Sequence, residues 1–330
     1  MAVPPEVPAG PHDSIDRTPP RHVASVRRTV HIDSIRPDGA IGRLVLEAGG
    51  RDLLTTADGA CTLDQAGLRI GTDADAVVTD ATGSPPRPGL SALVGRPIVS
   101  GFRLATQPLL APGEAGGLHA VLLDDIPVVA MISNYARLHA GESPTVEPDG
   151  LARKVDVCAG WRAGGAATEW AAAGTTPVPR GPVVPVLEHD DPLAWHMTPP
   201  LGPHTVRRRR RTDLRREGDH FLVDAMFRDV HADAEGHETV LHEYDLAVVV
   251  DAERLVVLDV VATPRVLPWR ECLEAVDSAS LFVGRHVRQL RRQLRLELRG
   301  PTTCTHLSDG LLGLNDLDRL IAALSVPAPT

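Results

Sequence analysis

One order of predicted elements occurs twice along this chain of 330 residues, and it restricts the fold more than any other feature. In each half, short segments that alternate apolar and polar residues come first, and segments with helical spacing follow. Some residues repeat as well. Leu93-Val94-Gly95-Arg96 is similar to Phe282-Val283-Gly284-Arg285, and Val77-Val78-Thr79-Asp80 is similar to Val256-Val257-Leu258-Asp259. We therefore predict an internal duplication, with chance similarity between two α+β units as the alternative.

Strands are predicted from β-propensity and from turn residues between the runs. In the first half they cover 23–33, 40–46, 51–56, 67–72 and 76–80, with Gly49-Gly50 and Asp73-Ala74-Asp75 as turns. In the second half they cover 205–214, 220–227, 239–250 and 254–263. Helices are predicted over 118–137, along an apolar stripe from Val283 to Leu298, and over 304–324.

These elements divide the chain into four parts. Residues 1–22 are rich in proline, which predicts a disordered tail. Residues 23–140 are predicted to form an N-terminal α+β unit, which is the degenerate copy, and residues 204–330 a C-terminal α+β unit. Residues 141–203 between them are predicted to be a Pro/Gly/Ala-rich linker. The predicted fold class is α+β. Each unit is an antiparallel β-meander followed by helices, and the two units form an intramolecular pseudo-dimer with a shared core.

Composition excludes several classes of protein. The net charge is −9, so the broad basic surface of a nucleic-acid binder is not expected. The start of the chain lacks the apolar core of a signal peptide, and no apolar run is long enough to span a membrane, which predicts a cytoplasmic protein without a membrane partner. Lys154 is the only lysine, a bias typical of a high-GC genome. Homo-oligomer formation is left open.

Four cysteines, Cys61, Cys158, Cys272 and Cys304, are too few for a disulfide framework and favour free thiols or metal ligands. Cys272, Cys304 and His306 lie on segments that the strand-then-helix order can bring together. Two thiolates and an imidazole are a partial ligand set for Zn²⁺ or Fe²⁺. The alternative is inert packing, because cysteine is among the most buried residue types. In the first half Gly117 takes the place of Cys304, and His119 that of His306.

His242 and Glu243 are neighbours in a predicted strand, so they point to opposite faces and only one can lie beside the cysteines. His242 would be the fourth metal ligand. Glu243 would be a general base, because burial raises the pKa of a carboxyl toward neutrality. An exposed polar pair on an edge strand is the alternative for both.

A run of five arginines, Arg207 to Arg211, alternates between the two faces of a predicted strand. We interpret it as a solvated edge strand, with an anion-binding site as the functional alternative. Two tryptophan-containing islands in the linker, around Trp161 and Trp195, are interpreted as anchors to the domains. Whether Cys158 and His196 also reach the cysteine-histidine site is left open.

Residues 186–318 resemble a bacterial family known as domain-of-unknown-function family 2889. The resemblance is carried by Asp191-Pro192-Leu193-Ala194-Trp195-His196, the arginine run, Phe227-Arg228-Asp229, His242-Glu243-Tyr244, Leu267-Pro268-Trp269-Arg270-Glu271-Cys272, Val283-Gly284 and Cys304-Thr305-His306-Leu307. Thr303 stands where the family has glycine. The resemblance implies that the cysteine and histidine segments form one constellation, and it suggests a role in aromatic or acyl-CoA catabolism.

The resulting hypothesis is a metal-dependent lyase or hydrolase that acts on a small carboxylate or acyl substrate. Cys272, Cys304, His306 and His242 would bind Zn²⁺ or Fe²⁺, Glu243 would move protons, and an arginine would hold the anionic group. A non-catalytic metal or iron–sulfur protein and a structural pseudo-dimer without a site are the alternatives.

Overall fold

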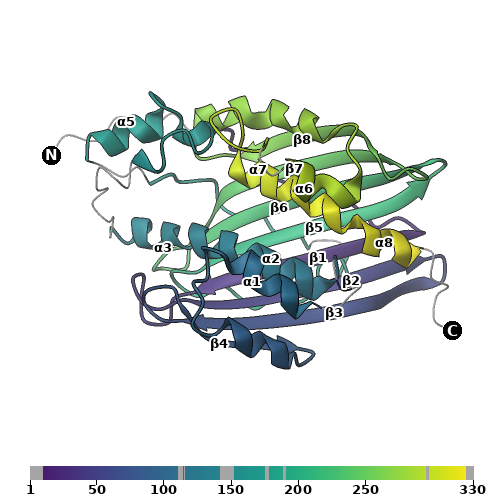
Figure 1. The fold of residues 1–330 in the computed structure, drawn as a ribbon, viewed down its shortest axis with the longest axis horizontal. Coiled ribbons are helices and arrows are strands. Elements are labelled where there is room, and N and C mark those ends of the chain that lie inside the picture. Colours follow the sequence, from purple (N-terminus) through teal and green to yellow (C-terminus); the bar gives the residue numbers. More distant parts are fainter. Residues whose placement is uncertain are drawn as a thin grey trace.

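Eight antiparallel strands form one sheet in the computed structural model of the chain, which describes residues 10–110, 114, 116–141, 152–174, 178–188, 191–294 and 297–324 (Figure 1). The strand order is β4-β3-β2-β1-β5-β6-β7-β8. The first four strands are β1 (Ser25–Ile35), β2 (Val45–Thr56), β3 (Gly59–Thr72) and β4 (Val78–Ser84), and the last four are β5 (Val206–Glu217), β6 (His220–Ala232), β7 (Glu238–Asp251) and β8 (Val257–Val266). Two meanders therefore meet where β1 pairs with β5.

Helices cover one face of this sheet, and helices of both halves contact the two central strands β1 and β5 (Figure 1). Those of the first half are η1 (Pro88–Leu93), α1 (Phe102–Thr106), η2 (Gln107–Leu109), α2 (Leu118–Ile132) and α3 (Asn134–His139). Those of the second half are η4 (Arg270–Phe282), η5 (Val287–Gln289), α6 (Leu290–Leu294), α7 (Thr305–Leu312), η6 (Gly313–Asp316) and α8 (Leu317–Leu324). The predicted fold class, strands followed by helices in each half, is confirmed at this level. The helix expected from 283 to 298 is instead the short pair η5 and α6.

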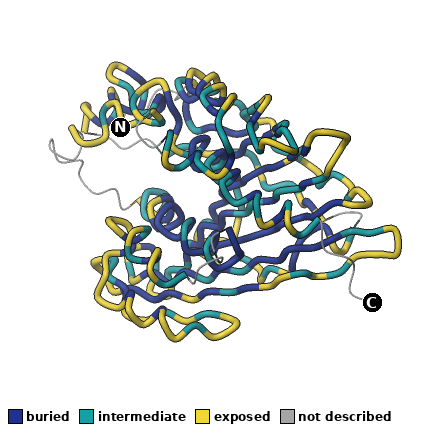
Figure 2. Tube along the Cα trace, turned by 45° about the vertical axis from the view of Figure 1, so that its right-hand side comes forward, coloured by how far each residue is buried: buried dark blue, intermediate teal, exposed yellow. Residues whose placement is uncertain are grey.

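Each half has its own hydrophobic core between its strands and its helices. Val30, Leu46 and Leu122 belong to the first core, and Val248, Phe282 and Leu311 to the second. Exposed residues gather at the hairpin ends and on the outer helix surfaces (Figure 2). The polar residues between the two cores, along β1 and β5, therefore decide how the halves meet.

The arginine run lies on β5, which is a central strand, so the expectation of a solvated edge strand is wrong. Each guanidinium is held by carboxylates. Arg207 pairs with Asp33, Arg208 with Asp229 and Asp309, Arg209 with Glu188, Arg210 with Asp125, and Arg211 with Asp213 and Asp224. A sequence of five arginines can occupy a sheet centre because each of them finds an acidic partner on a neighbouring element.

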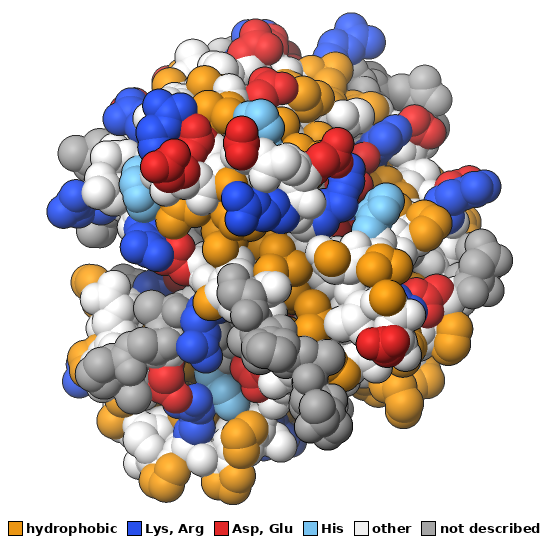
Figure 3. Space-filling view, turned by 90° about the vertical axis from the view of Figure 1, so that its right-hand side faces the viewer, with side chains coloured by type: hydrophobic (Ala, Val, Ile, Leu, Met, Phe, Trp, Pro, Cys, Tyr) orange, Lys and Arg blue, Asp and Glu red, His pale blue; other side chains and the backbone are white. Residues whose placement is uncertain are grey.

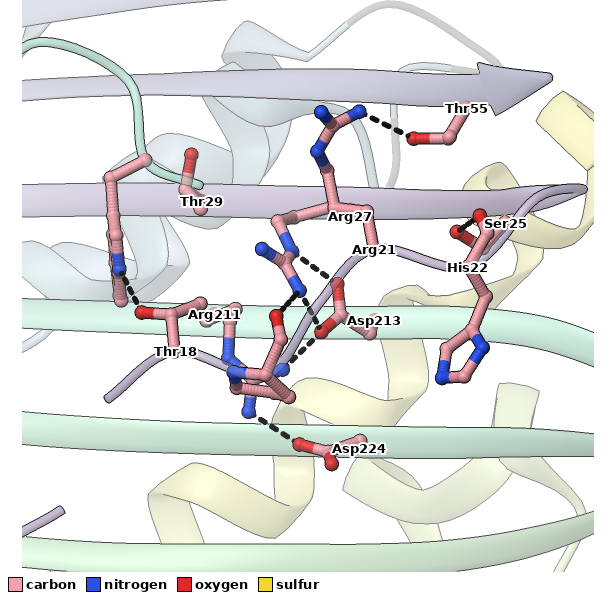
Figure 4. A network of polar contacts seen from close by, with 12 residues as sticks. Thr18, Arg21, His22, Ser25, Arg27, Thr29, Thr55, Arg211, Asp213 and Asp224 are labelled. Atoms are coloured by element: carbon pink, nitrogen blue, oxygen red, sulfur yellow. Dashed lines mark hydrogen bonds and ion pairs between the residues drawn. The ribbon is translucent and has the colours of Figure 1, made fainter. Parts of the chain in front are cut away.

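The face of the sheet away from the helices is contacted by residues 10–22 and by the described residues 183–188 and 191–200. Figure 4 shows part of their contact with the sheet, where Arg27 pairs with Asp213 and the Arg21 guanidinium donates to Thr55. Trp195 Nε1 donates to Thr18 Oγ1 at 2.8 Å. The segment around Trp195 thus lies on the face of the sheet away from the helices. Earlier in the chain, η3 (Ala159–Trp161) and α5 (Ala166–Ala172) precede it.

Gly49 and Gly50 do not form the predicted turn, because both lie within the continuous strand β2. Their side-chain-free backbone leaves room for neighbours across the sheet. A Cβ on Gly49 would come within 2.8 Å of His31 Cε1, and one on Gly50 within 2.8 Å of Val30 Cγ1. Glycine is present here for close approach rather than for a turn.

Several backbone contacts occur at matching places in the two halves. Gly95 N donates to Val78 O at 2.8 Å, and Gly284 N donates to Val257 O at 2.8 Å. The two glycines have φ values of 80° and 78°. The helices α2 and α7 begin after extended residues, Gly117 and Cys304.

Surface charge is mixed, since acidic and basic side chains are interspersed on the face seen in Figure 3. No helix in the described part of the chain is long and apolar enough to span a membrane.

Candidate functional site

A cleft of about 1570 Å³ lies on the helical side of the sheet, between the helices of the two halves. Its first wall includes Leu104 of α1, Val128 of α2 and Tyr135 of α3, and its second wall includes His306 and Leu312 of α7. Ligand sites in proteins commonly occupy about 300–1,000 Å³, so this space is large enough for a metabolite.

His306 and Tyr135 line this cleft, and the buried imidazole of His242 packs against both of them. The rings of His306 and His242 stack with centroids 3.8 Å apart, and the rings of Tyr135 and His242 meet edge to face at 5.6 Å. Tyr135 Oη is 3.4 Å from His242 Nε2. His306 is brought here by the first turn of α7, and His242 by the face of β7 that points toward the helices.

Asp229 orients His242. The two residues are cross-strand partners in β6 and β7, and His242 Nδ1 is 3.1 Å from Asp229 Oδ2. Asp229 is fully buried, yet the Arg208 guanidinium and the contact with His242 hold the pKa of its carboxyl low despite that burial. An ionised carboxylate only accepts hydrogen bonds, so Nδ1 of His242 is the donor in this contact.

The same carboxylate is fixed from its other side by Arg208. Its Nε and Nη2 atoms donate to the two Asp229 oxygens at 2.7 and 2.9 Å, and its Nη1 donates to Asp309 of α7 at 2.8 Å. Asp309 in turn accepts from Arg103 of α1. This chain of contacts fixes α7, and therefore His306, relative to the sheet.

Burial keeps the groups of this site in definite protonation states. It lowers the pKa of His306 well below the usual value, with the neighbouring His242 and Arg208 acting in the same direction, so His306 is neutral at neutral pH. Burial also raises the pKa of Tyr135, so its hydroxyl keeps its proton. The cleft therefore offers an uncharged imidazole and a hydroxyl donor side by side.

The predicted cysteine ligands lie in the second hydrophobic core. Cys272 and Cys304 are buried there, and burial raises the pKa of both thiols, which opposes formation of the thiolates that bind metals. Cys158 is half-buried and lines the cleft. Its own pKa is raised by burial, although the backbone amides of Trp161, Gly160 and Thr305 act in the opposite direction.

Glu243 and His196 lie on the other face of the sheet. Glu243 is ion-paired with Arg228 and accepts a hydrogen bond from the backbone of Ile15 at 2.6 Å. His196 Nε2 is 2.6 Å from His31 Nδ1. Of the predicted site residues, the structure thus brings together His242 and His306, and it places Glu243 on the opposite face.

Asp229, His242 and His306 form a group that could hold a metal ion, since one ligand atom from each lies within 4.8 Å of the others. Asp124, Asp125 and Asp309 form a second such group, and Asp233, Glu235 and His237 a third, more exposed one. Each carboxylate of the second group already accepts from an arginine.

Sequence reasoning missed Asp229 and Tyr135 as site residues. Asp229 could have been found from the turn around Gly236, because pairing the strands about that turn places it near His242. Tyr135 belongs to the other half of the chain, and nothing in the local pattern connects it with the second half.

One family model covers the strands and helices that carry His242 and His306. Residues 204–318 match the family described as Protein of unknown function (DUF2889). The predicted resemblance is confirmed over these residues. They include Arg208, Asp229, His242 and His306, whereas Tyr135 and the opposite wall of the cleft lie outside the match. No curated protein and no solved structure matches the chain.

Proposed function

We propose that the protein is a lyase or hydrolase that acts on a small carboxylate or acyl substrate in the cleft. The observation that supports this most is the neutral His306 at the cleft, stacked on a His242 whose Nδ1 donates to Asp229. His306 would accept a proton from the substrate or from water. The Tyr135 hydroxyl would donate a hydrogen bond to the oxygen on which negative charge develops.

Turnover tests this proposal directly. The unmodified protein (the parent) is assayed with p-nitrophenyl esters, acyl thioesters and β-hydroxy acids. The products followed are nitrophenolate, free thiol and the unsaturated acid left by loss of water, respectively. His306→Ala should lower kcat by about 10²–10⁴-fold, the usual contribution of a general acid or base. Cys61→Ser, a half-buried thiol outside the cleft lining, is the matched control. Unchanged turnover in His306→Ala would rule out the proposed role.

A second candidate is a divalent metal enzyme, favoured by the grouping of Asp229, His242 and His306 within 4.8 Å. Neutral imidazoles and a carboxylate are suitable ligands for Zn²⁺ or Fe²⁺. Both Asp229 oxygens already accept from Arg208, and the imidazole planes differ by only 20°, so the lone pairs do not converge without a ring rotation. For this reason we place acid–base chemistry first.

Elemental analysis of anaerobically purified protein separates the two candidates. Stoichiometric metal that is lost in His306→Ala and retained in Cys272→Ser would support the histidine–aspartate set. Metal lost in Cys272→Ser and Cys304→Ser would support the cysteine set predicted from the sequence. Turnover by a parent protein that contains no metal would support acid–base chemistry without a metal.

We also propose that the two halves, residues 23–140 and 204–330, are copies that form an intramolecular pseudo-dimer. The matched contacts of Gly95 and Gly284 support this, as do two ion pairs across the β1–β5 junction, Arg27 with Asp213 and Arg207 with Asp33. In both pairs the arginine precedes an aspartate by six positions on its own strand, which is the pattern that two copies related by a two-fold axis would produce.

A further inference from the structure

The cleft is positively charged in a protein of negative net charge. Its lining contains seven arginine and lysine side chains against four aspartates, an excess of three positive charges, whereas the whole chain carries −9. A concave surface with low-dielectric walls focuses such a potential and concentrates ligands of opposite charge. The cleft is therefore suited to an anion.

Three of these seven cations already have carboxylate partners. Arg103 and Arg291 are engaged by Asp124, and Arg288 by Asp318. The other four have no ion pair within the described ranges, and of these Lys154, Arg292 and Arg299 are exposed to solvent. Arg137 of α3 differs from those three because it is half-buried. Its Nε is buried without a hydrogen-bond partner in those ranges. Arg137 is thus a cation at the cleft whose charge is not neutralised by the described residues.

A second guanidinium adds to this positive charge. Arg36 follows β1, and it donates to the Gly42 carbonyl and to Ser133 Oγ, each at 3.0 Å, rather than to a carboxylate. Ser133 is the residue at which α3 begins, four positions before Arg137, so this contact holds the Arg36 guanidinium beside α3. Burial lowers the pKa of Arg36, and the charge of Arg137 acts in the same direction. Two like charges held together without an acid cost free energy that a bound anion would recover.

We infer that Arg137, with Arg36 behind it, is the anion subsite of the cleft, and that the ligand is an organic oxyanion whose carboxylate or phosphate lies there. The inference rests on the proposed function, since Tyr135, two residues before Arg137 on α3, would then face the reacting part of the same ligand. The planar guanidinium matches either oxyanion through two parallel hydrogen bonds. The five arginines of β5 cannot serve this purpose, because each is already paired.

Calorimetric titration of the full chain with three aromatic probes tests this subsite. Benzoate and phenyl phosphate carry the two oxyanions, and benzamide has a similar ring without a charge. Arg137→Gln should weaken binding of the better oxyanion by about 10–100-fold, the usual loss for a charged hydrogen bond, and leave benzamide unchanged. Arg137→Lys should recover part of the loss. The relative affinities for benzoate and phenyl phosphate decide which oxyanion the subsite prefers.

Arg254→Gln is the control, since Arg254 is an exposed residue paired with Asp251 in the β7–β8 turn. It should bind all probes as the parent does. Equal oxyanion affinity in the parent and Arg137→Gln would overturn the inference, as would a parent that binds neither oxyanion. His306→Ala should keep its affinity for the oxyanions. If that variant lost turnover while Arg137→Gln bound normally, the proposed function would stand and the anion subsite would not.

Discussion

The two halves of the sheet share a buried ion pair but differ in what surrounds it. In the first half Arg28 donates to Asp52 through Nε and Nη2, both at 2.7 Å, and in the second half Arg208 donates to Asp229 in the same way at 2.7 and 2.9 Å. Each pair joins directly opposite residues of neighbouring strands. The shared arrangement is structural, so the pair alone does not make a site.

What differs is the next strand. Asp52 lies opposite Asp64 of β3, whereas Asp229 lies opposite His242 of β7. The helix histidines also differ in their surroundings. His119 of α2 is buried, with its Nε2 lacking a partner among the described residues, and His306 of α7 stacks on His242 and lines the cleft. The two ion pairs thus differ in the residue opposite the aspartate, which is an aspartate on β3 and a histidine on β7.

Replacing the two helix histidines gives the largest expected contrast. His306→Ala should lower turnover by about 10²–10⁴-fold because it removes the proposed proton acceptor at the cleft. His119→Ala should leave kcat within about twofold, since His119 belongs to the other core. Steady-state rates of both variants, with circular dichroism to verify folding, provide the measurement. Equal losses in the two variants would mean that the halves do not differ in function.

Breaking the shared ion pair should reduce stability more in the first half than in the second, the reverse of the expected order for turnover. Asp52→Asn leaves the buried Arg28 charge with neutral acceptors alone, the new amide oxygen and the Gly116 carbonyl, and should cost about 3–5 kcal/mol of unfolding free energy. Asp229→Asn leaves Arg208 paired with Asp309, so a smaller loss, of about 1–3 kcal/mol, is expected. Urea unfolding of both variants measures this. A larger loss in Asp229→Asn would contradict the assigned roles.

Much of this contrast could be predicted from the sequence, because it depends on local patterns. Strands followed by helices in each half, the equivalence of Gly117 and Cys304, and the approach of His242 and His306 all follow from periodicity and spacing. In particular, the alternation of faces along β7 separates His242 from Glu243.

The remainder depends on pairing between distant parts of the chain. The β1–β5 junction joins Arg27 to Asp213, residues that no local pattern relates, and so the arginine run looked like an edge strand. Gly49 resembled a turn because the demand for space comes from His31 on another strand. Tyr135 reaches the site only because the helices of the two halves face each other across the cleft.

The histidine pair on the face of the sheet away from the helices should make stability depend on pH. Burial lowers the pKa of His31 and of His196, on the face away from the helices, to about 3 each. Their folded pKa values lie below the unfolded value of about 6.5, so the unfolded state binds more protons below that pH. Stability should therefore fall as the pH falls from about 6.5 toward 3, by up to about 1.4 kcal/mol per pH unit for each histidine.

His196→Gln isolates this contribution, because it removes one titrating group from the pair. Urea unfolding at about pH 7 and about pH 5 should show a smaller acid-induced loss in the variant than in the parent, by about 1–2 kcal/mol. Exposed His220, replaced by Gln, serves as the control and should behave as the parent does. An identical acid response in His196→Gln would show that the pair does not stay neutral in the folded protein.

The smallest expected effect is the loss of stability on replacing Gly95 or Gly284, and it tests whether the two halves have the same backbone conformation at these turns. Gly95 and Gly284 have φ values of 80° and 78°, and a Cβ on either would meet no atom within 4 Å. Alanine at these positions is therefore unfavourable only through the left-handed conformation, at about 1–2 kcal/mol. Gly95→Ala and Gly284→Ala should lower the unfolding free energy equally in urea. If the losses of unfolding free energy in the two variants differed by more than about 1 kcal/mol, the difference would exceed what the left-handed conformation of one residue explains. The two turns would then differ in their surroundings, and the halves would match only in strand order.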